Sequence, residues 1–288
     1  MREVGSVAVV GLGLIGGSLA RDLAARGVRV LAHDRDPAAV SAALREGVVH
    51  AALGASLEGV EEVDLLVLAV PVSAAPAVLA RVLPRLGSVR LVTDVGSTKE
   101  SVCSAAASLG IGDRFVGSHP LAGSHRSGWS ASREGLFRGA RVFLTPTPHT
   151  REDALSLARE VWTGIGARPE TLDATGHDRL LAWTSHLPQA AASALARALA
   201  GAGIPPAELG PGGRDATRLA ASSPEMWTAI ALDNAVPLST AVEALHAQLG
   251  DLHAALLRRD PEALRSFFTA AREWADGEDA PPPALPAP

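Results

Sequence analysis

Residues 6–18 read Ser-Val-Ala-Val-Val-Gly-Leu-Gly-Leu-Ile-Gly-Gly-Ser, an apolar run that ends in a glycine-rich turn. A helical pattern follows as far as Arg26, so the stretch predicts a strand, a tight turn and a helix. Gly11 permits the turn, Gly13 lets backbone approach a pyrophosphate, and Gly16 lets the helix pack on the strand. We therefore predict a dinucleotide site at the helix N-terminus. Its residues are Gly11, Leu12, Gly13, Leu14, Ile15 and Gly16.

An acidic side chain follows the next predicted strand. This strand covers residues 28–32 and leads into His33-Asp34, where a carboxylate would bind the ribose hydroxyls of NAD. Arg35 beside Asp34 leaves NADP open as the cofactor. A glycine turn with a purely structural role is the alternative, but the combination of strand, helix and acid favours nucleotide binding.

Strand and helix patterns alternate as far as Leu172. Strands are predicted over residues 64–70, 91–94, 114–117, 141–144 and 168–172, and helices over residues 37–47, 99–109 and 151–165. Val70 ends one predicted strand and Pro71 follows it, so we place both beside the cofactor, because ligands bind at the carboxyl ends of parallel strands. The predicted fold is an α/β Rossmann-type domain with a doubly wound parallel sheet over residues 1–173.

Only helical patterns remain after Thr175. An alanine-rich helix is predicted over residues 177–200, then a glycine- and proline-rich break over residues 201–213, then further helices to about Trp274. Alanine-rich faces on long helices favour packing against a second subunit. We predict an all-α substrate and dimerisation domain over residues 174–275, a homodimer through it, and a disordered proline-rich tail over residues 276–288.

The composition and the cysteine content argue against several classes of protein. The chain has 288 residues, of which 47% are hydrophobic and 20% charged, and its net charge is -5, as is typical of a globular protein without a nucleic-acid partner. Residues 65–72 are too short an apolar run for a membrane span, and no signal-peptide pattern is present. Cys103 is the only cysteine, and no spacing suggests a metal site. We expect a cytoplasmic protein without membrane, metal or nucleic-acid binding.

Lys99 is the only lysine among the 26 lysine and arginine residues. Because ammonium and guanidinium groups fill different spaces, this indicates either a requirement for an ammonium group or chance. Lys99 ends the run Asp-Val-Gly-Ser-Thr-Lys at residues 94–99, which follows a predicted strand. We expect this loop to point Ser97 and Lys99 at the cofactor. A role of Ser97 as a helix N-cap is the alternative and does not exclude catalysis.

His119 lies in a predicted loop of small residues that runs from Phe115 to Gly128. A His-Pro pair in a loop is usually a surface turn, so this stretch by itself does not establish catalysis. Its position between the nucleotide-binding half and the helical half makes His119 a candidate for proton transfer.

Five motifs in order carry a family resemblance. They are Gly-Leu-Gly-Leu-Ile-Gly-Gly-Ser at residues 11–18, Asp-Val-Gly-Ser-Thr-Lys at 94–99, His-Pro-Leu-Ala-Gly-Ser at 119–124, Ser-His-Leu-Pro at 185–188 and Gly-Gly-Arg-Asp-Ala-Thr-Arg at 212–218. With these motifs the chain resembles the prephenate/arogenate dehydrogenases of tyrosine biosynthesis over residues 6–274. The resemblance implies NAD-dependent oxidative decarboxylation of prephenate to 4-hydroxyphenylpyruvate or of arogenate to tyrosine.

The resemblance also implies roles for single residues. His119 would accept the carbinol proton, and Ser97 would hold the imidazole or the hydroxyl. Arg218 would bind a substrate carboxylate, although a structural ion pair is the alternative. The remaining residues implied in substrate binding are Ser124, Gln189, Trp227, Arg214 and Lys99.

The chain departs from the family pattern at two positions. Gln189 stands where many prephenate-using members have histidine, which favours arogenate, and His125 stands where a glutamate is frequent. His186 belongs to a family motif without an assigned role, and the nearby Pro188 suggests a helix kink.

Two other functions stay open at this point. A β-hydroxyacid dehydrogenase would have a similar architecture, but it would require a catalytic lysine in the C-terminal half, where the sequence has none. A non-catalytic NAD(H)-binding sensor would not need His119, Ser97 and Arg218 together.

Overall fold

The computed structural model describes residues 4–123 and 126–277. Its contacts divide the chain into two units. The first unit comprises Met1–Asp178 and Ala221–Asp233, and the second comprises Arg179–Ala220 and Asn234–Pro288. The predicted boundary lies after residue 173, whereas the first unit extends to Asp178, within helix α6 (Ala174–Leu181). Helix α9 (Pro224–Asp233) also belongs to the first unit.

The first unit contains the predicted doubly wound parallel sheet. Five parallel strands lie in the order β3-β2-β1-β4-β5. They are β1 (Ser6–Val10), β2 (Arg29–His33), β3 (Ala51–Ala52), β4 (Leu65–Leu68) and β5 (Leu91–Asp94). The sequence analysis missed β3, because two residues are too few to show a periodic pattern.

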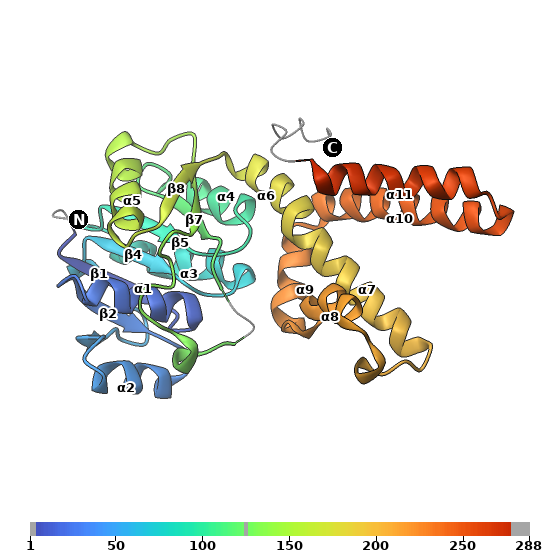
Figure 1. Ribbon diagram of the computed structural model, residues 1–288. Coiled ribbons are helices and arrows are strands. Elements are labelled where there is room, and N and C mark those ends of the chain that lie inside the picture. The colour runs from blue at the N-terminus through green and yellow to red at the C-terminus, as the bar shows by residue number, and fades with distance from the viewer. Residues whose placement is uncertain (1–3, 124–125, 278–288) are drawn as a thin grey trace. The chain divides into compact units, whose positions relative to one another are not determined.

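Helices cover both faces of this sheet (Figure 1). Val7 and Val9 of β1 belong to one hydrophobic core, whereas Ala8 and Val10 belong to the other. The first core includes residues of α1 (Leu14–Ala24), α2 (Pro37–Arg45) and α5 (Glu152–Gly164), and the second includes residues of α3 (Ala75–Val82) and α4 (Glu100–Ser108). A strand buried on both faces favours apolar residues at successive positions, as in residues 7–10 of β1 and throughout β4.

A second, mixed sheet follows in the same unit. It consists of β6 (Val116–Pro120), β7 (Arg141–Pro146) and β8 (Arg168–Thr171), with β6 antiparallel to β7 and β7 parallel to β8. The expectation that His119 lies in a loop is wrong, because His119 pairs with Phe143 inside the ladder. The apolar pattern ends before the strand does, so residues 118–120 carried no strand signal.

The second unit is helical. It includes the C-terminal part of α6, a π-helical turn η5 (Ala182–His186), α7 (Leu187–Gly201), α8 (Pro211–Thr217), α10 (Ala235–Arg258) and α11 (Pro261–Asp276). This π-helical turn lies directly before Pro188, where the sequence analysis expected a kink. Helix α8 begins inside the predicted glycine- and proline-rich break, with Pro211 at its first position.

Short 3₁₀ turns connect several of these elements. They are η1 (Val60–Glu62), η2 (Val72–Ala74), η3 (Leu83–Arg85), η4 (Trp129–Ala131), η6 (Pro206–Glu208) and η7 (Arg218–Ala221). The predicted tail falls largely on residues 278–288, which lie outside the described part of the chain. Asp276, its first predicted residue, is instead the last residue of α11.

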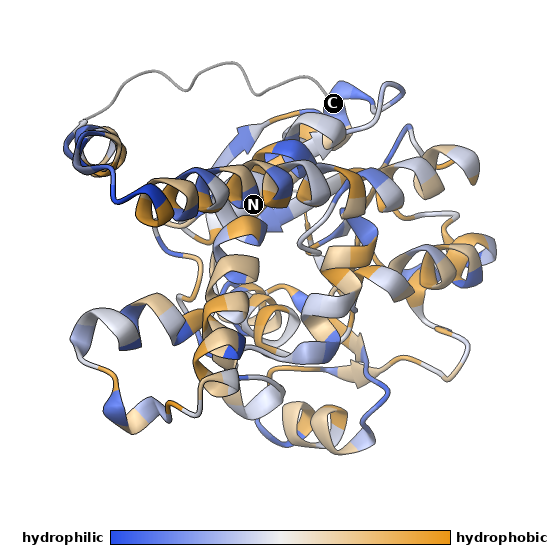
Figure 2. Cartoon of the chain, turned by 90° about the vertical axis from the view of Figure 1, so that its right-hand side faces the viewer, coloured by the Kyte–Doolittle hydropathy of each residue, from blue (hydrophilic) through white to orange (hydrophobic). Residues whose placement is uncertain are grey.

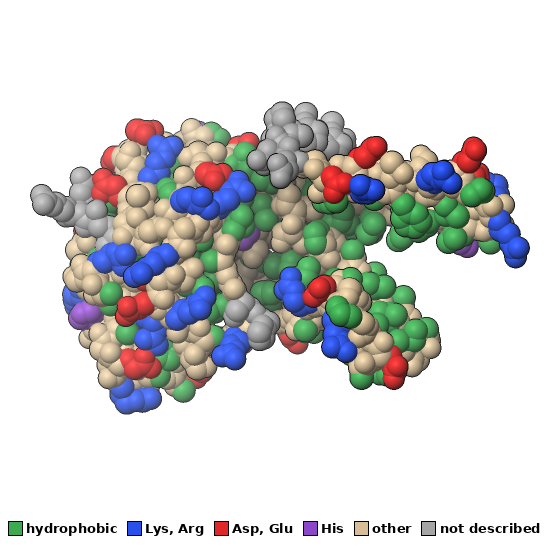
Figure 3. Space-filling model, in the orientation of Figure 1, with side chains coloured by type: hydrophobic (Ala, Val, Ile, Leu, Met, Phe, Trp, Pro, Cys, Tyr) green, Lys and Arg blue, Asp and Glu red, His purple; other side chains and the backbone are tan. Residues whose placement is uncertain are grey.

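Helices α10 and α11 expose large apolar side chains. Helix α10 buries only Ala241 and Ala255, and α11 buries none of its residues. Hydrophobic and hydrophilic residues alternate along the helices of this unit (Figure 2), and hydrophobic side chains gather on the visible face of α10 (Figure 3). Leu257 is 73% exposed and Trp274 is 85% exposed. Within the described residues no helix is both long and apolar enough to cross a membrane.

Candidate active site

The glycine turn has the geometry that a dinucleotide requires. Gly11 adopts a positive φ of 103°, and a Cβ on Gly11 would overlap the Ala69 carbonyl. A Cβ on Gly13 would meet no heavy atom within 4 Å, so the space in front of this residue is open. Gly13 also begins α1 without a side-chain cap. The turn therefore leaves backbone N–H groups and room for a phosphate at a helix N-terminus.

Asp34 lies beside this turn, as the sequence analysis expected. The N–H of Leu12 donates to the Asp34 carboxylate at 2.6 Å, and the N–H of Asp36 donates to its other oxygen at 2.8 Å. The acid is half-buried just after the end of β2. Val70 and Pro71 follow β4, the neighbour of β1. The residues predicted to bind the cofactor therefore gather at one edge of the sheet and fit a dinucleotide.

Lys99 is fully buried, with 0% exposure, and forms an ion pair with Asp94 at the end of β5. Asp94 also accepts a hydrogen bond from the Gly96 N–H at 2.8 Å. The Lys99 side chain is therefore enclosed and paired with an acid, whereas the sequence analysis expected it to be available to a substrate. A compact ammonium group fits this enclosed position, and a broader guanidinium would need more space and more partners. The geometry thus supplies a physical reason for a lysine at this position.

The N-terminus of α4 is capped from α6. The Asp178 carboxylate accepts hydrogen bonds from the N–H groups of Lys99 at 2.8 Å and Glu100 at 2.9 Å. Lys99 is the N-cap residue and its side chain makes no capping bond. The alternative in which Ser97 caps this helix is therefore wrong, since Ser97 lies half-buried in the bend before it. Asp178 joins the loop after β5 to α6.

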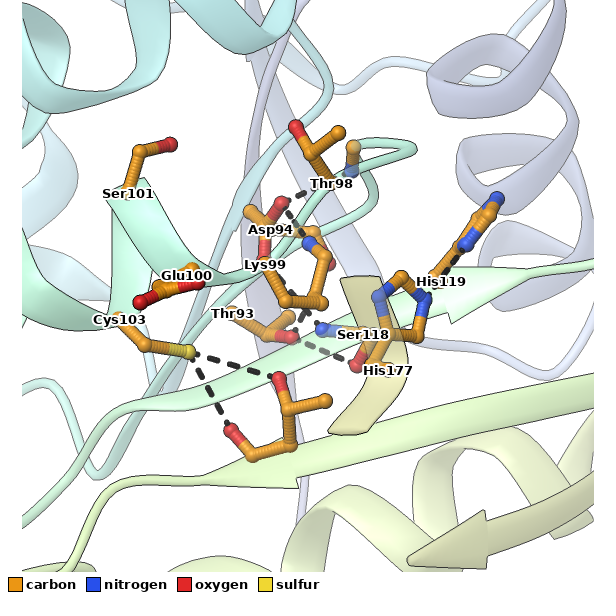
Figure 4. A network of polar contacts seen from close by, with 12 residues as sticks. Thr93, Asp94, Thr98, Lys99, Glu100, Ser101, Cys103, Ser118, His119 and His177 are labelled. Atoms are coloured by element: carbon orange, nitrogen blue, oxygen red, sulfur yellow. Dashed lines mark hydrogen bonds and ion pairs between the residues drawn. The ribbon is translucent and has the colours of Figure 1, made fainter. Parts of the chain in front are cut away.

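His119 forms a hydrogen bond with a second histidine. Its Nδ1 lies 2.9 Å from Nε2 of His177, and Nδ1 of His177 lies 2.7 Å from the Asp178 carboxylate. The two rings meet edge to face at 5.1 Å (Figure 4). His177 has 0% exposure, whereas His119 is half-buried. Burial lowers the pKa of His177, and the hydrogen bond to Asp178 offsets this only in part.

A buried polar network fixes the strand that carries His119. The hydroxyls of Ser118 and Thr93 lie 2.8 Å apart, and the Trp162 indole N–H donates to Ser118 at 3.0 Å. The Ser118 N–H donates to Asp94 at 3.3 Å. Nearby Cys103 is a neutral thiol, because burial raises its pKa to about 11. These contacts hold β6 against β5 and supply no nucleophile.

The remaining predicted substrate residues are distributed over both units. Trp227 lies half-buried on α9 in the first unit, and Arg214 and Arg218 are exposed in the second unit. Gln189 is buried on α7 and donates to the Leu219 carbonyl at 2.9 Å. It therefore contacts the turn that contains Arg218. Ser124 and His125 lie outside the described residues.

Two residues in contact with His119 or its surroundings were not predicted as members of the site. His177 contacts His119, and Asp178 contacts the loop after β5. Within the second unit, Asn234 donates to the ring of buried His186 at 3.0 Å. The available signal was the run of three titratable residues at 177–179, near the start of a predicted helix. The described residues contain no cluster of three potential metal ligands.

A Rossmann-type unit with a glycine turn and an acid after its second strand, followed by a helical unit, is typical of two-domain nucleotide-binding dehydrogenases. Residues 19–171 match the family model described as prephenate dehydrogenase, nucleotide-binding domain. Residues 173–270 match the model described as prephenate dehydrogenase, dimerization domain. The chain belongs to the prephenate dehydrogenase family.

Individual relatives agree with this assignment. The chain is 34% identical over 279 residues to a cyclohexadienyl dehydrogenase of Zymomonas mobilis, covering 93% of this chain and 94% of the relative. Its structure is similar to that of prephenate dehydrogenase from Aquifex aeolicus in complex with hydroxyphenyl propionate and NAD+, with a TM-score of 0.86, 30% identity and coverages of 94% and 96%. It is also similar to Synechocystis arogenate dehydrogenase, with a TM-score of 0.79, 29% identity and coverages of 94% and 99%.

Proposed function

We propose that the chain is an NAD-dependent dehydrogenase that oxidatively decarboxylates prephenate or arogenate. The observation that carries the proposal is the match of both family domains, in order, along residues 19–171 and 173–270. The geometry of the glycine turn and of His119 agrees with it.

The glycine turn and Asp34 would hold the cofactor. Backbone N–H groups at the start of α1 suit the pyrophosphate, and the Asp34 carboxylate suits the ribose hydroxyls. When bound, NAD supplies the hydride acceptor for the ring carbinol carbon. A carboxylate at position 34 would repel the additional phosphate of NADP, so the site favours NAD.

His119 would accept the proton of the carbinol hydroxyl. Hydride departure becomes easier as this proton is withdrawn, and carbon dioxide is lost as the ring becomes aromatic. His119 is half-buried at the end of β6, next to the fixed Ser118 network. Ser97, in the bend after β5, would hold the imidazole or the hydroxyl in place.

Charged and polar groups would orient the substrate carboxylates. Arg218 would bind one of them through its planar guanidinium, and Arg214 would assist at the entrance. Trp227 would supply an apolar wall. These roles, like that of Ser124, follow from the family relationship and are part of the proposal.

Gln189 would influence the choice between the two substrates. Its amide N–H group donates to the Leu219 carbonyl and to Ser193 at 3.3 Å, so it contacts the turn adjoining Arg218. An amide cannot become cationic, and we therefore infer a preference for arogenate, which carries an amino group where prephenate has a keto group.

We also propose a homodimer in the cytoplasm. The second unit matches a family dimerization domain, and its helices α10 and α11 expose apolar side chains that a monomer would leave in water. A partner copy related by a two-fold axis would bury these side chains.

Direct assay of the purified protein tests the proposed function. Mixing the protein with NAD and either prephenate or arogenate should produce NADH and release carbon dioxide in equal amounts. The ratio of the two kcat/KM values tests the substrate preference. Oxidation of open-chain β-hydroxy acids alone, or NAD binding without turnover of any of these substrates, would contradict the proposal.

A further inference from the structure

We propose that His177, anchored by Asp178, is a positioning residue that holds His119 in the tautomer with its proton on Nδ1 and none on Nε2. The inference rests on the proposed role of His119 as the proton acceptor. It adds His177 and Asp178 to the proposed active site, where hydrogen bonds connect Asp178 to His177 and His177 to His119.

The first step is the fixed position of the Asp178 carboxylate. One of its oxygens accepts from the Lys99 N–H, and the other accepts from the Glu100 N–H, at the start of α4. Backbone donors at a helix N-terminus hold a carboxylate in one orientation and favour its negative charge. Asp178 therefore presents an acceptor, and not a donor, to the neighbouring ring.

The second step is the tautomer of His177. Its Nδ1 lies 2.7 Å from the Asp178 carboxylate, so this nitrogen carries the proton. Four titratable groups influence the ring: Asp178 on its own helix, His119 on β6, Lys99 at the start of α4 and Asp94 on β5. Lys99 and Asp94 neutralise each other as an ion pair.

Burial decides the charge of His177. It is the largest influence on the ring and lowers the pKa, although Asp178 acts in the opposite direction. His177 is therefore neutral at neutral pH, and its Nε2 carries a lone pair. Transfer of a proton from His119 to Nε2 of His177 would make the buried His177 ring a cation, which burial opposes.

The third step is the tautomer of His119. Nε2 of His177 can only accept, so Nδ1 of His119, at 2.9 Å, must donate. The same His119 ring then has an unprotonated Nε2. This nitrogen can accept the proton of a substrate hydroxyl: the O–H bond breaks, an Nε2–H bond forms, and the proton later passes to water.

The arrangement also stabilises the product of that step. When Nε2 of His119 gains the proton, the ring becomes a cation whose Nδ1–H still donates to His177. A hydrogen bond from a charged donor is stronger than one from a neutral donor. His177 therefore supports the charged form of His119 as well as its reactive tautomer, without exchanging a proton itself.

The tautomer can be measured without any substrate. In protein labelled with ¹⁵N-histidine, NMR at mildly alkaline pH should show His119 with its proton on Nδ1, and the signal should vanish in His119→Asn. A proton on Nε2 of His119 in the wild-type protein would overturn the inference. This outcome does not depend on whether prephenate or arogenate is the substrate, so it is separate from a failure of the proposed function.

Two substitutions of His177 distinguish positioning from a merely structural role. His177→Gln places an amide oxygen near the former Nε2 and should keep the Nδ1 tautomer of His119 and most of kcat. His177→Leu removes the acceptor and should lower kcat about tenfold or more, with KM retained and a mixture of His119 tautomers. His149→Gln, at an exposed position, is the matched control. Equal kcat values and equal NMR spectra for the two His177 variants would contradict the proposal.

Discussion

The N–H of Leu12 in the glycine turn donates a 2.6 Å hydrogen bond to the carboxylate of Asp34 after the neighbouring strand. This hydrogen bond fixes the position of the acid relative to the turn without a contribution from the cofactor. Substitution of Asp34 by serine should remove the negative charge that disfavours the additional phosphate of NADP.

We expect Asp34→Ser to raise the ratio of NADP to NAD kcat/KM by on the order of tenfold or more. Initial rates with the two cofactors at saturating substrate measure this ratio. Asp36→Ser is the matched control, because serine can replace the capping carboxylate of Asp36 at the start of α2. If Asp34→Ser leaves the ratio unchanged, Asp34 does not determine cofactor choice.

His119→Asn should lower kcat by a factor on the order of 10² or more, with KM nearly unchanged. Asparagine can still accept a hydrogen bond, but it cannot take up a proton at neutral pH. Steady-state kinetics of the variant beside His149→Gln provides the measurement. A kcat within a few-fold of the wild-type value would remove His119 from the proton-transfer step.

Arg218→Ala should raise KM by about tenfold or more, because a substrate carboxylate loses its bidentate partner. The exposed Arg197 on α7 offers a control in the same unit, and Arg197→Ala should leave KM unchanged. Substrate titrations of both variants at saturating NAD compare them. A normal KM for Arg218→Ala would exclude the proposed carboxylate contact.

The buried His177 should make the protein less stable in mild acid. Its folded-state pKa lies below 6.5, so the unfolded chain binds a proton first as the pH falls. The free energy of unfolding therefore decreases below about pH 6.5, by at most about 1.4 kcal/mol per pH unit for this residue, and the loss ends at the lowered folded pKa.

Urea unfolding at a series of pH values tests this dependence. His177→Gln, which does not titrate, should show a shallower decrease below about pH 6.5. Above that pH the two proteins should differ by a constant amount. Parallel stability curves across the whole acid range would show that folding does not lower the pKa of His177.

Leu257→Glu should weaken the proposed dimer. This side chain is 73% exposed on α10, and a charge placed at an apolar interface costs several kcal/mol unless it is paired. Sedimentation at several protein concentrations would show dissociation. Leu44→Glu changes a leucine that is 39% exposed on α2 in the first unit, and it should leave the oligomeric state unchanged. If Leu257→Glu stays dimeric, this part of α10 lies outside the interface.

Prediction of the fold from the sequence succeeded where local patterns are strong. The predicted strands at residues 6–10 and 91–94 have the observed bounds of β1 and β5. The strand before His119 was misplaced because Ser118, His119 and Pro120 lack an apolar pattern. Their strand conformation comes from pairing with β7, which is a long-range interaction.

The candidate site was predicted less completely than the fold. Asp34 was correctly placed beside the glycine turn, because both follow neighbouring parallel strands. Lys99 was expected to face a ligand, but it is buried against Asp94. The capping of α4 by Asp178 was also not predicted, because the partner comes from a helix 78 residues away in the chain.

The sequence by itself determined the alternation of strands and helices in the first half of the chain apart from β3, the glycine turn with its acid, and His119 as a candidate base. These features depend on backbone preferences and on apolar periods within short segments. Only the tertiary structure decided which nitrogen of His119 carries the proton. That depends on His177 and Asp178, 58 and 59 positions further along the chain, and on a burial that keeps His177 neutral.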